Sequence, residues 1–353
     1  MMGVSADRIR ELAGRAVDPA IKAILDRKVA LLEGRSPDRS RRLGLVAEGG
    51  AMRATISGGS FIALDFLGLN DVFDHIYASS AGSINGAYFL SGQIQYGVAV
   101  YYQLINNRKF VNLWGFVDPT GRAKVVDMDF LFDDIITGER ALDVGRVVAG
   151  PTSLHASATR ADDGKGVLFN STDPGIDLVM ALKAGSAIPV FYNRAVRVGE
   201  ESFVDGSVGN ALPLEDALAN GCTDVLVLAT RPAGYRKVPS GLFWRSYDGF
   251  RLRHYSRAFV EQYFSRHVRY NRAMQLIEEL ESQRSTANVS VVRPEGIVSQ
   301  TATRERSLKR VTMEAVGLTL RKFGCEDVDV AEVIQPVLRS SRHIDERLEQ
   351  HAE

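Results

Sequence analysis

Ser80 is the first residue whose surroundings indicate covalent chemistry. It follows a strand candidate, 75–78, and precedes small residues and a helix-like segment that reaches about Leu90. At such a strand-to-helix turn the serine hydroxyl is forced into the open, and the free N–H groups of the helix start favour developing negative charge. The segment 78–82, ASSAG, supplies the small side chains that so crowded a turn requires. Ser80 is therefore a candidate nucleophile, although a small-residue turn that lets a helix pack closely on a strand explains the same pattern.

The glycine-rich loop 48–53, EGGAMR, is the second candidate feature, and it directly follows the apolar run 43–47. Such a loop between a strand and a helix exposes backbone N–H groups towards one point, which can bind a phosphate or an oxyanion. The loop lacks the Lys-Ser/Thr ending of a P-loop and is not GxGxxG, so the pattern gives poor support for a nucleotide site. A plain tight turn explains the glycines but has no use for Arg53 beside them.

Asp205 is the third candidate, because it follows the apolar strand 202–204 and precedes Gly206. An Asp at this place can sit at the carboxyl edge of a sheet, where ligand crevices form in open α/β folds. Taken alone, the pair is explained by an ordinary Asp-Gly turn. A glycine-rich loop, a serine and a carboxylate that each follow a strand are a stronger signal, and together they predict one reaction centre.

With these pieces in this order, the chain resembles a patatin-like phospholipase of the bacterial-type branch. The family pattern is a glycine-rich loop with a basic residue, then GxSxG, then DG[GA]. The matching pieces in this chain are EGGAMR (48–53), ASSAGS (78–83), DGS (205–207), KAGSAIP (183–189) and DMDFL (127–131), and the tail strand with Arg293-Pro294 matches more weakly. The likeness covers about 40–230 well and 240–325 loosely. Three positions depart from the pattern: Ala51 and Ala78 replace glycines, and Ser207 replaces a smaller residue. If position 78 needs a positive φ, alanine is strained there, and if it needs only small volume, alanine suffices.

The resemblance implies a lipid acyl hydrolase with a Ser80–Asp205 dyad, in which Asp205 accepts the serine proton during attack on an ester carbonyl. The implied oxyanion-hole donors are the backbone amides of Gly49, Gly50, Ala51 and Met52. The implied supporting residues are Arg53, Gly82 and Gly206. Arg53 either draws a substrate phosphate or braces the loop, and we favour the bracing role. A carboxylate is a weak base near pH 7, so Asp205 needs partial desolvation or a tight hydrogen bond. The expected partner is a lipid or ester substrate, and neither a metal nor a cofactor is implied.

Two alternatives stay open at this point. A Ser-His-Asp triad of the α/β-hydrolase kind needs a histidine after the Asp. The histidines that follow it are His254, His267, His343 and His351. None of them follows a strand with a loop signature, and we expect His254 and His267 within a helix. A catalytically weak or inactive lipid-binding or scaffold protein on the same fold is the other alternative, because the three departures lie in the motifs themselves.

Periodicity predicts an α/β fold, with a mainly parallel central sheet and helices on both faces in three layers. We expect a helical extension and linker over 1–40, a catalytic core over 41–235, and a mostly helical region with one further strand over 236–353. The clearest buried strand is 224–229, and 289–293 is the late strand. The sequence does not define the oligomeric state.

Composition limits the remaining function classes. Lys plus Arg and Asp plus Glu number 43 each, so a neutral chain argues against bulk nucleic-acid binding. The two cysteines, Cys222 and Cys325, stand in no metal motif, and we expect reduced core thiols. The start of the chain lacks an apolar signal region and no run approaches a membrane span, which predicts a cytoplasmic protein with peripheral lipid contact at most.

The stretch 243–272 is basic and aromatic, which suits an anionic lipid surface. A helix pair whose aromatic side chains pack on the core is the simpler interpretation of that stretch.

Overall fold

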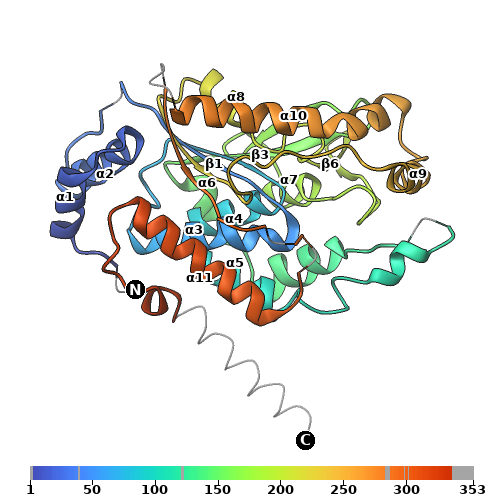
Figure 1. The fold of residues 1–353 in the computed structure, drawn as a ribbon, viewed down its shortest axis with the longest axis horizontal. Helices are drawn as coiled ribbons and strands as arrows, with labels where there is room; N and C mark the ends of the chain where they lie inside the picture. Colours follow the sequence, from blue (N-terminus) through green and yellow to red (C-terminus); the bar gives the residue numbers. More distant parts are fainter. Residues whose placement is uncertain are drawn as a thin grey trace, which may run out of the picture.

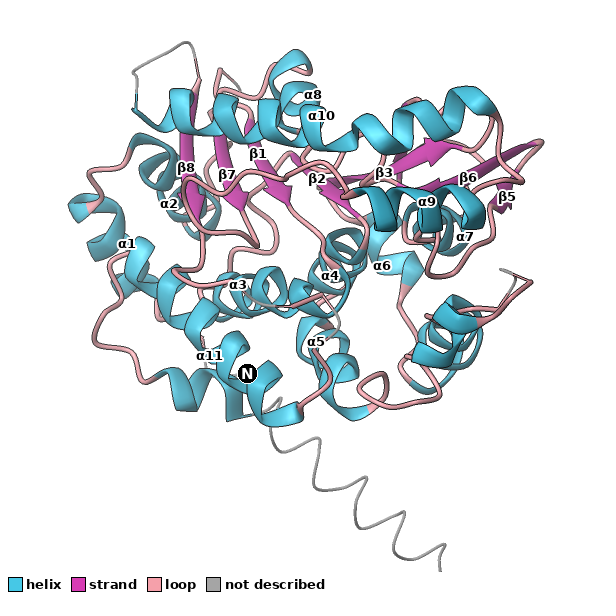
Figure 2. Ribbon diagram, turned by 45° about the vertical axis from the view of Figure 1, so that its right-hand side comes forward, coloured by secondary structure: helices cyan, strands magenta, loops and turns pink. Residues whose placement is uncertain are grey.

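The computed structural model describes residues 3–335 except 39, 121–122, 283–286, 298 and 301. Its strands are β1 (Leu43–Ala47), β2 (His75–Ser79), β3 (Ser153–Arg160), β4 (Gly166–Asn170), β5 (Val196–Val198), β6 (Glu201–Asp205), β7 (Asp224–Leu228) and β8 (Asn288–Val292). Within the described residues these strands form one sheet in the order β5-β6-β3-β2-β1-β7-β8, with β4 paired to β3 beside that path (Figure 2). The five strands from β3 to β8 in this order run parallel, while β4 and β6 pair antiparallel with β3, and β5 pairs antiparallel with β6. The expected mainly parallel sheet is confirmed.

Helices cover both faces of the sheet, which confirms the three-layer arrangement (Figure 1). One face carries α8 (Leu214–Ala219) and α10 (Arg257–Ser282). The other carries α3 (Thr55–Phe66), α4 (Ala81–Leu90), α6 (Val144–Ala149) and α7 (Leu178–Gly185), with α5 (Ile94–Gln103) and α11 (Glu305–Lys322) packed against α3. The remaining helices are α1 (Ala6–Arg15), α2 (Pro19–Leu32), α9 (Leu242–Arg251), the short 3₁₀ helices η1 (Ala51–Ala54) and η2 (Leu113–Val117), and the π-helix η3 (Phe130–Glu139).

The central strands are apolar on both sides because both faces of the sheet are covered. Val46 and Val227 pack with Met274 of α10, whereas their neighbours Leu45 and Leu226 belong to the cluster on the opposite face. Successive side chains of a strand point to opposite faces, so each residue of these strands is buried on one side or the other. This is why the sequence shows continuous apolar runs rather than alternation.

The two strands that carry the candidate motifs lead directly into helices. β1 is followed by the loop 48–50 and then by η1 and α3, and β2 is followed by Ser80 and then by α4. β1 and β2 are parallel neighbours, with Ala47 opposite Ala78. Both helix starts therefore lie at the same edge of the sheet, and the glycine-rich loop and Ser80 are brought side by side.

The C-terminal part of the chain completes the same sheet. The strand expected at 289–293 is β8, and it pairs in parallel with β7. The divisions at 40/41 and 235/236 stay predictions. Cys222 and Cys325 are both buried free thiols, as expected.

Candidate active site

Ser80 occupies a strained turn between β2 and α4. Its φ of 54° and ψ of −136° lie in a region that a non-glycine residue rarely adopts. Ala78 lies inside β2 and is not among the residues with positive φ, so position 78 requires small volume only, and its alanine is unstrained. At Gly82 an added Cβ would stand 2.8 Å from the Ala47 oxygen. Glycine at position 82 therefore lets α4 begin directly against the end of β1.

Ser80 and Asp205 are in direct hydrogen-bond contact. The Ser80 Oγ donates to Asp205 Oδ2 over 2.6 Å, and the Ser207 amide donates to Asp205 Oδ1 over 2.7 Å. The Asp205 side chain is fully buried, and Ser80 is 6% exposed. Strand register explains the meeting, because Ser79 lies opposite Ser157 of β3, and the next residue of β3, Ala158, lies opposite Asp205 of β6.

The turn after Asp205 packs tightly against its neighbours. An added Cβ at Gly206 would stand 2.4 Å from the Ser157 oxygen, so only glycine lets this turn approach β3. The Asp205 amide donates to the Ala187 oxygen over 3.0 Å, and the Gly206 amide donates to the Gly185 oxygen over 3.1 Å. The end of α7 and the residues just after it thus fix the backbone that carries Asp205.

Burial raises the pKa of Asp205 above its ordinary value, and this is the largest influence on that carboxyl. Hydrogen bonds from Ser207 and Ser80 and the positive charge of Lys237 act in the opposite direction. A carboxylate with a raised pKa is a better proton acceptor near neutral pH than an ordinary one. Asp205 therefore has the desolvation that we expected a carboxylate base to need near neutral pH.

The glycine-rich loop lies directly on the turn that holds Ser80. An added Cβ at Gly49 would stand 2.4 Å from the Ser79 oxygen and 2.7 Å from the Ser80 Cβ. Gly50 has a φ of 145° and Ala51 a φ of 51°, so the loop is bent through conformations that favour glycine. Because Ala51 is not glycine, it carries backbone strain beside Ser80.

Three of the four expected oxyanion donors have free amide hydrogens in the described part of the chain. They are the amides of Gly49, Gly50 and Ala51, which donate to no described residue. The Met52 amide is different, since it donates to the Gln300 oxygen over 3.1 Å. Met52 is thus occupied in this arrangement, and the first three amides are the ones available to an oxyanion.

Arg53 is buried beneath the loop and holds it in place. Its Nε donates to Thr230 Oγ1 over 3.0 Å, and Thr230 Oγ1 donates to the Gly49 oxygen over 3.0 Å. Its Nη2 lies 3.9 Å from Glu48 Oε1. These contacts support the bracing role that we expected for Arg53.

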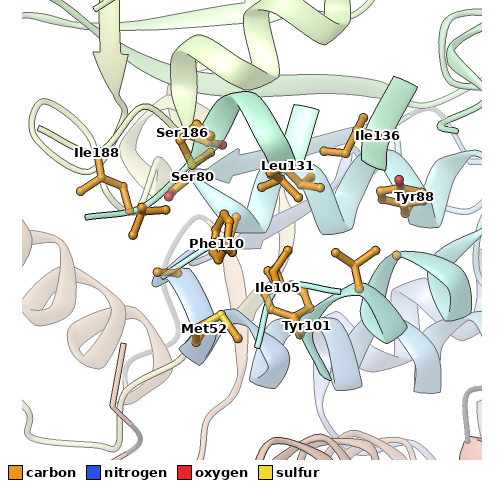
Figure 3. Close-up of a pocket in the computed structure, with 17 residues that line it drawn as sticks. Met52, Ser80, Tyr88, Tyr101, Ile105, Phe110, Leu131, Ile136, Ser186 and Ile188 are labelled. Carbon is orange, nitrogen blue, oxygen red and sulfur yellow. The ribbon is translucent and has the colours of Figure 1, made fainter. Parts of the chain in front are cut away.

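Two cavities meet at Ser80. The apolar pocket has an empty volume of about 530 Å³ and extends between α4, α5 and η3. In Figure 3, Ser80 and Ser186 lie towards one end of this pocket, and Tyr88 and Ile136 lie at the other. The polar vestibule has an empty volume of about 730 Å³ and contains Asp205 and the glycine-rich loop. The residues that line both cavities are Ala51, Met52, Ser80, Phe110, Val126 and Ile188.

An ionic cluster holds one wall of the apolar pocket. The Asp129 carboxylate lies 3.0 Å from the Nζ of Lys183 in α7, accepts a hydrogen bond from Tyr192 over 2.5 Å, and pairs with Lys124. Partial burial alone raises the pKa of Asp129, but these hydrogen bonds outweigh it and hold that pKa well below its usual range. The DMDFL motif thus has a structural use, because Asp129 fixes the segment that presents Met128 to the pocket.

The described histidines lie away from both cavities. His75 is the first residue of β2, and His155 lies within β3. The two rings contact each other, with 3.1 Å between His75 Nδ1 and His155 Nε2. His267 lies in α10, as expected, but the expectation for His254 was wrong, because it lies in the turn between α9 and α10. His343 and His351 lie outside the described residues. None of the four described histidines lines a cavity at Ser80, and Asp205 bonds to Ser80 directly.

Neither a metal cluster nor a membrane span is present in the described residues. No group of three or more His, Cys, Asp or Glu side chains there is arranged to hold a metal ion. In the same part of the chain, every helix is too short or too polar to cross a membrane.

Comparisons with known proteins point to one family. The model of the family described as patatin-like phospholipase matches residues 45–218. The uncharacterised protein YjjU of Escherichia coli K12 is 27% identical over 209 residues, which make up 56% of this chain and 54% of YjjU. The chain therefore spans about half the length of this curated relative.

Two solved structures are also similar to the chain. VipD from Legionella pneumophila has a TM-score of 0.46 and 12% identity, and the match covers 82% of this chain and 68% of VipD. Human GIVD cytosolic phospholipase A2 has a TM-score of 0.26 and 17% identity, over 59% of this chain and 31% of that chain.

Proposed function

Because the chain belongs to the patatin-like phospholipase family, we propose that it is a serine-dependent lipid acyl hydrolase with Ser80 as nucleophile and Asp205 as base. The observation that carries the proposal is the 2.6 Å hydrogen bond from Ser80 to a buried carboxylate at the junction of an apolar and a polar cavity. A fatty-acid ester matches these two cavities, because its apolar acyl chain and its polar alcohol part are joined at the ester group. The apolar pocket takes the acyl chain, and the vestibule takes the alcohol part.

The reaction proceeds through an acyl-enzyme. Asp205 accepts the proton of the Ser80 hydroxyl as Oγ forms a bond to the ester carbonyl carbon, and the carbonyl oxygen becomes an oxyanion. The free amides of Gly49, Gly50 and Ala51 stabilise that charge. Collapse of the tetrahedral intermediate breaks the ester bond, and the leaving alcohol takes the proton from Asp205. Water then attacks the acyl-enzyme, passes a proton to Asp205 and releases the fatty acid, while the proton returns to Ser80.

A fluorophosphonate probe and a lysophospholipid substrate test this proposal together. We expect the probe to label Ser80 in the wild-type protein but not in Ser80→Ala, and we expect Ser80→Ala and Asp205→Asn to lose hydrolysis. The variants His254→Ala and His267→Ala serve as controls and should keep activity. Loss of activity in either histidine variant, beside its loss in Asp205→Asn, would favour a triad. An unlabelled Ser80 in a folded protein would favour the inactive lipid-binding alternative.

An exposed apolar surface beside the vestibule fits a lipid interface. Phe110 and Val111 line the vestibule just before η2, and Lys237 lines it just before α9. The large apolar side chains exposed on these two helices are Leu113, Trp114, Val117, Leu242, Phe243, Trp244 and Phe250. Tyr247 of α9 donates to the Phe116 oxygen over 2.9 Å, so the two helices are joined. In α10, by contrast, Phe259 and Tyr263 are buried.

We therefore assign the surface of η2 and α9 to peripheral contact with an anionic membrane. The exposed basic residues nearby in the chain are Arg108, Lys109, Arg245 and Arg253, and basic groups beside exposed aromatic rings favour anionic lipid. Trp114→Ala and Trp244→Ala should each weaken sedimentation with phosphatidylglycerol vesicles, whereas Val268→Ala, an exposed apolar position on α10, should not. Equal binding to neutral and anionic vesicles by all of these proteins would remove the assignment.

A further inference from the structure

Lys237 lies in the wall of the vestibule and is held there by its backbone. Its amide donates to Asn271 Oδ1 over 2.7 Å, and its carbonyl oxygen accepts from Asn271 Nδ2 over 2.9 Å. Both bonds anchor the residue to α10. The Nζ stands 4.2 Å from the centre of the Tyr270 ring, so the ammonium is positioned over an aromatic face.

The ammonium group of Lys237 lacks an acceptor. Within the described ranges, no hydrogen bond or ion pair involves its Nζ, although the side chain is partly buried. A partly desolvated ammonium without an acceptor is unfavourable, and an anionic ligand would relieve that cost. Burial also lowers the pKa of Lys237 to about 8.

The charges around Lys237 favour an anion. The groups that act on it are Glu48, Arg53, Arg231 and Arg266, and the Asp205 carboxyl also senses its charge. Three of these neighbours are positive and two are acidic, so with Lys237 itself the cations outnumber the carboxyls. Arg53 is already engaged with Thr230 and Glu48 beneath the loop. The Nη1 of Arg53 is buried without a partner, so Arg53 and Lys237 both present cationic groups to the vestibule. Lys237 is the one whose charged group makes neither a hydrogen bond nor an ion pair within the described ranges.

We propose that Lys237 binds the phosphate of a lipid head group and so selects phosphate-bearing esters over neutral ones. This inference rests on the proposed function, because an ester carbonyl at Ser80 with its chain in the apolar pocket leaves the head group in the vestibule. The phosphate is the anionic part of such a head group, and a lysine ammonium binds phosphate as a point charge.

A binding experiment on the Ser80→Ala protein separates this inference from catalysis. The probes are dodecylphosphocholine, which carries a phosphate, and dodecyl maltoside, which has the same chain and no charge. Adding Lys237→Met should weaken binding of dodecylphosphocholine at least about tenfold and leave dodecyl maltoside within about twofold. Lys237→Arg should retain most of the preference. Lys165→Met removes an exposed lysine in the turn between β3 and β4 and should change neither affinity.

Several outcomes would overturn the inference. Equal loss for both detergents would mean that Lys237 only shapes the cavity, and unchanged binding of both would mean that it contacts neither. Inorganic phosphate that binds as tightly as dodecylphosphocholine would indicate a free-anion site instead of a head-group site. If the wild-type protein hydrolyses no ester but still prefers dodecylphosphocholine to dodecyl maltoside, the proposed function is contradicted and the role of Lys237 is not.

The pH dependence gives a second readout. The Lys237 cation is present below its pKa of about 8 and is lost as the pH rises through that value. The preference of the Ser80→Ala protein for dodecylphosphocholine should therefore decline between about pH 7 and about pH 9. In Lys237→Arg the guanidinium stays charged, so the preference should persist. A decline that is equal in both proteins would assign the titration to another group and overturn the role of Lys237.

Discussion

Replacement of Gly49 by alanine is the sharpest perturbation of the loop that faces Ser80. The added methyl group would stand 2.4 Å from the Ser79 oxygen and 2.7 Å from the Ser80 Cβ. Ordinary contacts of a Cβ begin at 3.4 Å, so the loop and the turn must separate by about 1 Å. Neither neighbour is the end of a flexible side chain, and the movement therefore has to come from the backbone that carries the reaction centre.

The expected size of the effect follows from that movement. A misplacement of about 1 Å in a reaction centre costs about 10²-fold in rate, and loss of one oxyanion donor costs about 10²–10³-fold. We therefore expect kcat/KM of Gly49→Ala to fall at least about 100-fold. Overpacking of this kind typically costs about 1–3 kcal/mol of stability, so the protein should still fold.

Hydrolysis of a soluble p-nitrophenyl ester and thermal unfolding measure the two effects. Gly14→Ala is the matched control, because nothing lies within 4 Å of an added Cβ at this position in α1. That variant should keep full activity and gain about 0.5–1 kcal/mol of stability. Folded Gly49→Ala protein with kcat/KM within about threefold of wild type would refute the reasoning that places the oxyanion at this loop.

Three further substitutions have definite expected outcomes. Ala51→Gly should keep activity, since the amide remains, and should raise stability by up to about 1 kcal/mol by relieving the left-handed alanine; a lower Tm would contradict this. Asp205→Asn should be about 1–3 kcal/mol more stable than wild type at neutral pH, because the raised pKa of Asp205 makes its ionised form unfavourable. The extra stability of Asp205→Asn should appear as the pH rises through the folded-state pKa of Asp205 and should vanish in acid. Urea titrations of both proteins that show the opposite trend would exclude this explanation. Arg251→Met should cost about 3 kcal/mol or more, since three hydrogen bonds to backbone carbonyls are lost, and the two to Gly115 and Val190 are buried; unchanged urea unfolding would show that these bonds contribute little.

The strand-and-helix pattern of the core could be predicted from the sequence because its signals are local. β1, β2 and β7 are short apolar runs that end at glycine or small residues, and these are the strands that carry or flank the motifs. The motifs also predicted which residues meet, since Ser80 and Asp205 are hydrogen-bonded. Their catalytic roles, and those of the loop amides, stay predictions.

Asp205 reaches the predicted place by a different route. The expectation was an Asp just after a strand, at the carboxyl edge of the sheet, and the strand that carries it, β6, runs antiparallel to β3. Periodicity shows that a strand exists and says nothing about its direction. What places Asp205 beside Ser80 is the pairing with Ala158, which depends on sequence-distant contacts.

Other features of the site have no local signal at all. Most side chains of the apolar pocket come from several helices and loops between 81 and 136, joined by Met52 and Ile188, and these apolar residues are typical of an ordinary core. Lys237 lies in an irregular loop, where a single lysine is unremarkable until its missing acceptor is seen. The Met52 amide is occupied by Gln300, almost 250 residues away, and no motif could have indicated that contact.

The antiparallel pairing of β6 with β3 also determines which length changes the chain can tolerate. Side chains alternate between the faces of a strand, so inserting or deleting one residue within β6 would turn Asp205 to the opposite side of the sheet and abolish its contact with Ser80. The turn at 161–165 between β3 and β4 is not under this constraint, because the positions of Ala158 and Asp205 do not depend on its length. Natural insertions and deletions in homologues should accordingly avoid β6.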